Sequence, residues 1–315
     1  MNEPVIVLSE LSKSFGDVQA VRNLSLSIDA GTIFGFLGPN GAGKTTTIRM
    51  LCGLTHPTAG TAMIAGRDVW QDRHLARTKF GYVAQRFSLY PDLTVEENLR
   101  FFGGACRVPP AQLDNQIARL LSLTDLEKKR DAPAGSLSGG MRQLLSLGCA
   151  LVHEPPLLLL DEPTAGLDPV HRHQIWNLLY DLSHAGKTIL VMTHYMDEAE
   201  RCTEVGFLQN GQLLAKASPR ALKTTFRAKL LEIDVDPVMP ALVRLRNVPE
   251  ILGVSLRSGA VRIYAPEPEK LSATWRANWP FQDLRLLGER WVEPDMEDVF
   301  TAYSQGYDAL LKEAQ

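Results

Sequence analysis

The sequence predicts an α/β fold built on a parallel sheet, followed by a small α+β appendage. Residues 31–54, GTIFGFLGPNGAGKTTTIRMLCGL, read as an apolar strand, a glycine-rich turn and a helix. Residues 157–163 (LLLLDEP) and 187–194 (KTILVMTH) are continuous apolar runs, as expected of strands buried on both faces of a parallel sheet. The amphipathic stretch between them, residues 171–186, predicts a helix that connects two such strands.

The elements around this core are predicted from local patterns. Alternating apolar residues predict two strands within residues 1–30, and further strands are expected between residues 61 and 85. Residues 93–130 are predicted to be mostly helical. Asn210-Gly211 marks the turn of a β-hairpin.

The residue pattern changes after Pro219-Arg220. We therefore expect one domain over residues 1–222 and a small accessory domain over residues 223–315. The accessory domain should contain several strands and a short helix that starts at Asp295.

Composition excludes several classes of protein. The chain of 315 residues is 45% hydrophobic and 22% charged, with a formal net charge of −3, so no global basic field favours nucleic acid as a partner. No stretch reaches the roughly 18–20 apolar residues that a membrane-spanning helix needs, and the first residues do not resemble a signal peptide. The four cysteines are scattered, which is typical of reduced thiols in the cytosol rather than of disulfides or a zinc site.

A phosphate-binding loop is the first motif that carries chemistry. The sequence matches G-x-x-x-x-G-K-[ST] at every fixed position, between the predicted strand and helix that this motif requires. Backbone N–H groups of the loop and the N-terminus of the helix would bind phosphate oxygens. Lys44 would bind the β- and γ-phosphates, and the Thr45 hydroxyl would coordinate Mg²⁺. The predicted nucleotide-binding residues here are Gly38, Pro39, Asn40, Gly41, Ala42, Gly43, Lys44, Thr45 and Thr46.

Two acidic residues follow the apolar run at residues 157–160. Asp161 is placed to coordinate Mg²⁺, directly or through water. Glu162 comes next, at the carboxyl end of the predicted strand, where α/β sheets bind their ligands. It is placed to orient an attacking water molecule and to accept its proton.

The segment Ser136-Leu-Ser-Gly-Gly-Met141 precedes the acidic strand at the start of a predicted helix. This segment resembles the LSGGQ signature of ABC ATPases. The resemblance implies that Ser138, Gly139 and Gly140 expose a helix N-terminus that binds a γ-phosphate. Other elements of that family occur in the same order along residues 15–194. They are Phe15 as the aromatic that stacks on adenine, Gln85 as the Q-loop glutamine, Asp168 in the D-loop and His194 as the switch histidine.

The resemblance covers about two thirds of the chain. It implies a P-loop NTPase fold of the ABC ATPase type, with a RecA-like core, an antiparallel β subdomain and a helical signature subdomain. It also implies ATP and Mg²⁺ as cofactors, with Lys44, Gln85, Glu162 and His194 as catalytic residues and Thr45, Gln85 and Asp161 as metal ligands. Two such domains would pair head to tail, so a second ATP-binding subunit is expected, in a homodimer or with a sister subunit.

One position departs from the family pattern. Met141 replaces the glutamine of the signature, but SGGM is frequent in ATPases of the ABC-2 exporter group. The serine and the two glycines that would hold phosphate are present. We therefore expect the site to be active.

The tail indicates a branch of the family. Residues 288–304, GERWVEPDMEDVFTAYS, resemble the closing motif of drug- and antibiotic-export ATPases of the ABC-2 group, although EPDMEDVF also reads as a plain helix N-terminus. Residues 90–99, YPDLTVEENL, resemble the segment on which a coupling helix of a membrane partner docks. The resemblance implies a polytopic permease as partner and a cytoplasmic location on the inner face of the cell membrane. The cargo is not indicated.

Alternative interpretations remain. An ABC ATPase without a membrane partner would be expected to carry two nucleotide domains or a coiled-coil insertion, and neither is evident in the sequence. An importer subunit would share all of this chemistry. His171 and His173 do not share a helical face, which disfavours a metal site. Trp275, Trp279 and Trp291 could form a ligand surface, but the core of a small domain is favoured.

Overall fold

The computed structural model describes residues 3–85, 89–227 and 229–312. The chain divides into two compact units, Met1–Ala217 and Ser218–Gln315. Helix α8 (Pro219–Thr224) belongs to the second unit, so the sequence-based boundary at 222/223 lies within this helix. Within the described residues, no helix combines the length and apolar character that crossing a bilayer demands.

A six-stranded sheet forms the centre of the first unit, in the order β10-β9-β3-β8-β7-β6. The five strands from β9 to β6 pair in parallel, and β10 joins the edge as the antiparallel partner of β9 in the predicted hairpin. The strands are β3 (Ile33–Leu37), β6 (Phe80–Val83), β7 (Leu157–Asp161), β8 (Thr188–Thr193), β9 (Glu204–Gln209) and β10 (Gln212–Ala217). Every residue of β3, β7 and β8 is buried, as their continuous apolar sequences predict.

A second sheet of the first unit is antiparallel, with the order β2-β1-β4-β5. Its strands are β1 (Pro4–Phe15), β2 (Val18–Asp29), β4 (Ala59–Ile64) and β5 (Arg67–Asp68). Alternate residues of β2 are buried from Leu24 to Ile28, so one face of this strand packs on the core. The helices of the sheet region are α1 (Lys44–Leu51), α2 (Arg73–Arg77), α6 (Pro169–His184) and α7 (Met196–Ala199).

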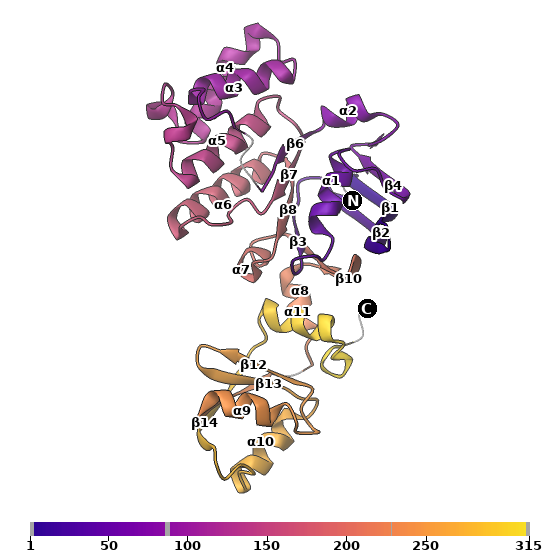
Figure 1. Cartoon of the computed structure of the whole chain (residues 1–315), viewed down its shortest axis with the longest axis vertical. Helices are drawn as coiled ribbons and strands as arrows, with labels where there is room; N and C mark the ends of the chain where they lie inside the picture. The colour runs from indigo at the N-terminus through magenta and orange to yellow at the C-terminus, as the bar shows by residue number, and fades with distance from the viewer. Residues whose placement is uncertain (1–2, 86–88, 228, 313–315) are drawn as a thin grey trace. The chain divides into compact units, whose positions relative to one another are not determined.

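The helical part of the first unit contains α3 (Val95–Ala105), α4 (Pro110–Leu123) and α5 (Gly139–Leu151). Short 3-10 turns at Glu127–Lys129 and Ala134–Ser136 lie between α4 and α5. Thr94 begins α3 with a capping box, because its side chain accepts a hydrogen bond from the N–H of Glu97 and the Glu97 carboxylate accepts one from the N–H of Thr94. Within this unit, Figure 1 shows the helical cluster and the antiparallel sheet on opposite sides of the parallel strands. This confirms the three-part ABC ATPase arrangement.

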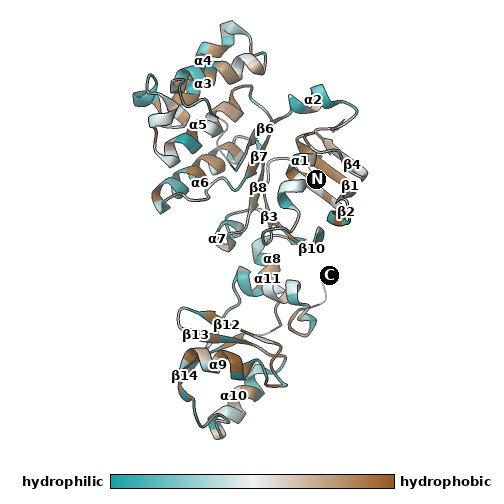
Figure 2. Ribbon diagram, viewed as in Figure 1, coloured by the Kyte–Doolittle hydropathy of each residue, from teal (hydrophilic) through white to brown (hydrophobic). Residues whose placement is uncertain are grey.

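Apolar side chains of both sheets form one core. It includes Ile6, Ile28, Phe34, Ile48 and Leu159, each no more than 1% exposed. Figure 2 shows hydrophobic residues concentrated along the strands of the first unit and along α9 of the second. The strands next to the phosphate-binding loop are therefore held in place by this core.

The second unit has the order β11 (Leu230–Asp236), α9 (Val238–Leu245), β12 (Gly253–Arg257), β13 (Ala260–Tyr264), α10 (Pro268–Ala277) and β14 (Arg285–Val292). The sheet order is β12-β13-β11-β14 and every neighbouring pair is antiparallel. This is the split β-α-β topology of ferredoxin-like domains. The sequence predicted only a small α+β domain. Helix α11 (Met296–Gln305) and a 3-10 turn at Asp308–Leu310 follow.

The tryptophans of this unit belong to its core, as the sequence favoured. Trp275 is buried, and Trp279 and Trp291 are partly buried against the same cluster. Trp279 lies edge-on to both Trp275 and Phe281, with ring centroids 5.2 Å apart in each pair.

A buried ionic network attaches α11 to the sheet of the second unit. Asp295 caps the helix as predicted, and Asp298 completes a capping box with it. Arg262 donates hydrogen bonds to both carboxylates, at 2.9 Å and 2.6 Å, and Tyr264 donates one to Asp298 at 2.8 Å. Burial raises the pKa of Asp298, and the neighbouring charge of Asp295 acts in the same direction. The acidic residues of the tail therefore have a structural role in this unit.

We expect Asp298→Ala to destabilise the second unit by about 3 kcal/mol, because it removes a buried carboxylate that accepts hydrogen bonds from both Arg262 and Tyr264. The free energy of unfolding would be measured by urea titration of the whole chain. Glu269→Ala is the control, since Glu269 lies exposed on α10 and its loss should cost about 0.5 kcal/mol or less. Equal losses in both variants would contradict the role given to the network.

Candidate active site

The predicted site residues follow four neighbouring strands. The sheet order places β3, β8, β7 and β6 side by side and parallel, so their carboxyl ends meet at one edge. The phosphate-binding loop follows β3, His194 follows β8, Asp161 ends β7 and Gln85 comes two residues after β6. Segments that lie far apart in the sequence are thus brought to one place.

Glycines give the phosphate-binding loop its path. Gly43 has a φ of 105°, in the left-handed region that other residues avoid, and a Cβ there would lie 2.5 Å from the carbonyl oxygen of Ala20. At Gly38 a Cβ would lie 2.2 Å from the carbonyl oxygen of Leu208. Helix α1 begins directly after Gly43, so the N–H groups of its first turn have no acceptor within the helix and are available to an anion.

Lys44 is held by the loop itself. Its ammonium group donates hydrogen bonds to the carbonyl oxygens of Gly38 and Pro39, at 2.6 Å and 3.0 Å, and the residue is 5% exposed. Burial lowers the pKa of Lys44, and the charges of Glu162 and Asp161 partly oppose this change. The ammonium group is therefore held by two carbonyl oxygens of the loop, at the first residue of helix α1, and the charges of two carboxylates act on it.

A cavity of about 300 Å³ opens over this loop. Phe15 lies on its border and is 53% exposed, with the ammonium group of Lys13 4.9 Å from the centre of its ring. An exposed aromatic ring at the mouth of a cavity is suited to stacking on a flat heterocycle. The lining residues are Phe15, Ala20, Asn40, Gly41, Ala42, Gly43, Lys44, Thr45, Thr46, Gln85 and Glu162.

The two acidic residues of the site lie in different environments. Asp161 is 3% exposed at the end of β7, and its burial and the charge of Glu162 raise its pKa. Glu162 leaves the strand with a φ of 50°, in the left-handed region that is rare for residues other than glycine. Its N–H donates to the carbonyl oxygen of Met192 on β8, at 2.9 Å, which fixes this bend. The strained backbone turns the Glu162 side chain toward the cavity.

Both carboxylate oxygens of Glu162 accept hydrogen bonds. The Gln85 amide donates from Nε2 to Oε2 at 2.8 Å, and His194 Nδ1 lies 2.9 Å from Oε1. Since an ionised carboxylate only accepts, His194 donates this bond from Nδ1. The structure thus brings Gln85, Glu162 and His194 into direct contact at the cavity edge.

The signature segment lies apart from this cavity. Ser138 caps α5 by accepting a hydrogen bond from the N–H of Met141, at 3.3 Å. Asp168 caps α6, accepts hydrogen bonds from the N–H groups of Val170 and His171, and also pairs with the His171 ring. These hydrogen bonds lower the pKa of Asp168. Neither segment lines the cavity over the phosphate-binding loop of its own chain.

Two contacts of predicted site residues were missed by the sequence analysis. A Cβ on Gly140 would lie 2.0 Å from the His171 ring, so this glycine is required by packing as well as by any ligand. Ala20 lines the cavity, and its carbonyl oxygen excludes a side chain at Gly43. No local pattern marks either contact, because both join segments that are distant in the sequence. Within the described ranges, no cluster of histidine, cysteine or acidic residues is arranged to hold a metal by itself, and His173 is exposed.

Comparisons with known proteins agree with this geometry. Residues 21–165 match the family described as ABC transporter. The chain is 41% identical over 299 residues to the Nod factor export ATP-binding protein I of Ralstonia nicotianae, which covers 94% of this chain and 92% of that protein. It is 43% identical over 221 residues to the probable multidrug ABC transporter ATP-binding protein YbhF of Escherichia coli, covering 70% of this chain and 38% of that protein.

A solved structure shows a similar fold. It is a dimeric ATP-binding cassette in a post-hydrolysis state, bound to ADP and phosphate. The similarity covers 68% of this chain and 98% of that chain, with a TM-score of 0.59 and 29% sequence identity.

Replacing Lys44 tests the phosphate-binding loop. Lys44→Ala should weaken ATP binding about 10- to 100-fold, because a charge-assisted hydrogen bond to phosphate is lost. Affinity would be measured by titration with a fluorescent ATP analogue. Lys128→Ala, at an exposed lysine of the 3-10 turn after α4, is the control and should bind normally. Unchanged affinity in Lys44→Ala would refute the assignment.

Proposed function

The chain belongs to the ABC transporter family as one of its ATP-binding subunits, and from this premise we propose that it powers efflux through a separately encoded permease. The protein binds ATP and hydrolyses it. The observation that carries the proposed mechanism of hydrolysis is the contact of Glu162 with Gln85 and His194 beside the phosphate-binding loop. It supplies a candidate base at the place where a γ-phosphate would lie.

Glu162 is the base in this proposal. Its carboxylate would orient the attacking water molecule and accept its proton, while Lys44 and the first turn of α1 hold the β- and γ-phosphates. Gln85 and His194 each bind one oxygen of Glu162, which fixes the carboxylate before the reaction begins. Phe15 would stack on the adenine ring at the mouth of the cavity.

Magnesium fits the donor groups at this site. Thr45 and Gln85 line the cavity with a hydroxyl and an amide, and Asp161 lies at the end of the neighbouring strand. Oxygen ligands of this kind, with one carboxylate and the substrate's own phosphates, are typical of Mg²⁺ sites. When bound, Mg²⁺ would neutralise charge that develops on the phosphates.

The signature segment is proposed to act on a second subunit. Ser138, Gly139 and Gly140 begin a helix of 13 residues but do not line the cavity of their own chain. The positive end of such a helix would bind the γ-phosphate held by the phosphate-binding loop of a partner. Head-to-tail pairing, in a homodimer or with a sister subunit, supplies that phosphate. ATP binding would then close the dimer, and hydrolysis would open it.

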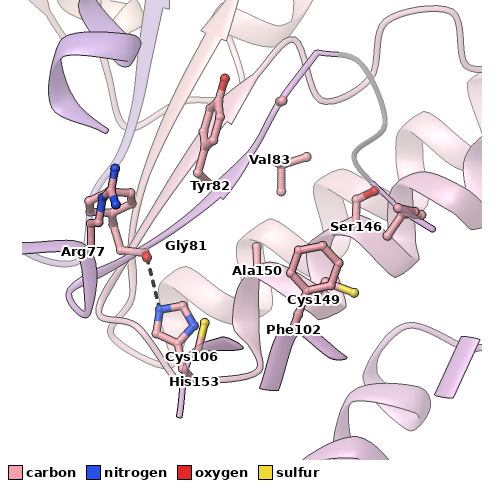
Figure 3. A pocket seen from close by; sticks show the side chains of 13 residues that line it. Arg77, Gly81, Tyr82, Val83, Phe102, Cys106, Ser146, Cys149, Ala150 and His153 are labelled. Atoms are coloured by element: carbon pink, nitrogen blue, oxygen red, sulfur yellow. Dashed lines mark hydrogen bonds between the residues drawn. The ribbon is translucent and has the colours of Figure 1, made fainter. Parts of the chain in front are cut away.

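A pocket in the first unit is the proposed docking place of the permease (Figure 3). It measures about 170 Å³ and lies between β6 and the helices α3 and α5, with Tyr82, Phe102 and Ala150 in its lining. Tyr90 and Phe101 stand beside Phe102 in one aromatic cluster, although they are 45% and 46% exposed. Exposed aromatic side chains around a small pocket suit an apolar side chain from a helix of a partner.

Export is the proposed direction of transport. The relatives are an export protein and a probable multidrug transporter protein by name, and the tail resembles the closing motif of the ABC-2 export group. Attachment to a permease would place the chain on the cytoplasmic side of the cell membrane. An importer or an ATPase without a membrane partner would share the same catalytic residues, so transport is tested separately from hydrolysis.

Replacing Glu162 tests the catalytic base. Glu162→Gln should bind ATP normally but hydrolyse it at least about 100-fold more slowly, because general base catalysis contributes about 10²- to 10⁴-fold. Phosphate release and the dimer fraction with ATP would both be measured, and the dimer should accumulate. Glu127→Gln, at an exposed glutamate, is the control. Hydrolysis at the wild-type rate would show that another group is the base.

The membrane partner is tested with the same variant. Glu162→Gln, locked with Mg-ATP and recovered from native membranes, should copurify with a polytopic membrane protein in about equal amount. Adding Phe101→Ser should reduce that recovery, because it removes an exposed aromatic ring of the proposed docking surface. Leu54→Ser is the control, since Leu54 is also exposed, at 55%, but lies outside the aromatic cluster of Tyr90, Phe101 and Phe102 and outside the pocket. Recovery of soluble or ribosomal partners alone would overturn the transport proposal.

A further inference from the structure

Glu198 is a fully buried carboxylate behind the active site. It lies in α7 and is 0% exposed. Its Oε2 accepts a hydrogen bond from the hydroxyl of Thr193 at 2.7 Å, and its Oε1 accepts a short one from the hydroxyl of Thr164. Both threonines are also 0% exposed. Burying a carboxylate costs free energy unless hydrogen bonds compensate, so the burial of Glu198 needs an explanation.

The two threonines lie at the carboxyl ends of neighbouring strands, one in strand β8 and one in the turn after β7. Thr193 is the last residue of β8 and directly precedes His194. Thr164 follows Glu162 by two residues, in the turn that leaves β7. Glu198 therefore joins the backbone segments that carry the base and the histidine.

Together these contacts form a closed ring. Glu162 bonds to His194 through their side chains, His194 follows Thr193, Thr193 bonds to Glu198, and Glu198 bonds to Thr164 in the turn after Glu162. The hydroxyl of Thr193 also accepts a hydrogen bond from the N–H of Tyr195, at 3.0 Å, which fixes the chain on both sides of His194.

We propose that Glu198 is a positioning residue for hydrolysis, which sets the distance between Glu162 and His194 by holding Thr164 and Thr193. Glu198 is not among the residues that line the cavity, so its effect on hydrolysis is transmitted through these two threonines. A displacement of about 1 Å in a catalytic group can lower a rate about 100-fold. The inference rests on the roles proposed above for Glu162 and His194.

A purely structural role would have other consequences. A carboxylate that only stabilised α7 would, when its partners change, lower the unfolding midpoint and leave kcat intact. A positioning residue lowers kcat while ATP affinity, which depends on Lys44 and the loop, stays unchanged. Its effect must also depend on the presence of His194. The experiment therefore compares kcat, the affinity for ATP and the dependence of kcat on His194.

The test replaces Thr164, because its substitution with valine removes the hydroxyl and keeps the shape. Thr164→Val should lower kcat about 10- to 100-fold, with the Kd for ATP close to wild type. Because the lost hydrogen bond to Glu198 also lowers the unfolding midpoint, kcat is measured at a temperature at which the variant is fully folded. Thr164→Ser, which keeps the hydroxyl, should restore most of the rate. Asp197→Asn is the control on α7, since Asp197 has a side chain that is 59% exposed and should leave kcat unchanged.

A double-mutant cycle with His194→Ala completes the experiment, using radiolabelled phosphate release to quantify low rates. If Glu198 acts through His194, Thr164→Val should lower kcat much less in the His194→Ala background than in the wild type. An unchanged kcat in Thr164→Val, or an equal fold-loss in both backgrounds, would overturn the inference. Glu162→Gln is assayed in parallel, because retained hydrolysis there refutes the proposed base whatever Thr164 does.

Discussion

The parallel pairing of β3, β8, β7 and β6 is the constraint on which the site depends. Leu37 pairs with Thr193, Met192 with Asp161, and Leu160 with Val83, so the ends of the four strands are in register. A slip of one residue would turn every side chain of a strand to the opposite face. In β7 such a slip would displace Asp161 and Glu162 from the end of the strand, so the hydrogen bonds between Gln85, Glu162 and His194 depend on this register.

The charges of Lys44 and Asp161 affect each other's pKa already in the absence of a ligand. Burial alone would favour neutral forms of both Lys44 and Asp161, since it lowers the pKa of the ammonium group and raises that of the carboxyl group. Each charge opposes the effect of burial on the other, so the pair supports its own ionisation. An anionic triphosphate would add to the stabilisation of Lys44, while a cation would do the same for Asp161. The two charges thus suit the joint binding of ATP and Mg²⁺ that is proposed for this site.

The parts of the site that could be predicted from the sequence are those that depend on local geometry. The loop from Gly38 to Thr45 was identifiable because tight backbone turns need glycine at fixed spacing, and Asp161 because an acid that ends an apolar strand is unusual. The ring through Glu198 and the contact of Gly140 with His171 were not predictable, since each joins segments that only the fold brings together. The strand order of the second unit was missed for the same reason: alternation marks a strand but does not identify its neighbour.

The tail illustrates how a family motif and a folding signal can coincide. The carboxylates of Asp295 and Asp298 cap α11 and also bind Arg262, which in turn bonds to Glu232 on β11. Their hydrogen-bonding capacity is largely used inside the second unit, and Asp298 is 0% exposed. These two aspartates of the motif therefore stabilise the accessory fold. If export depends on a contact made by this chain, that contact is better sought at the aromatic cluster beside β6, whose side chains remain exposed.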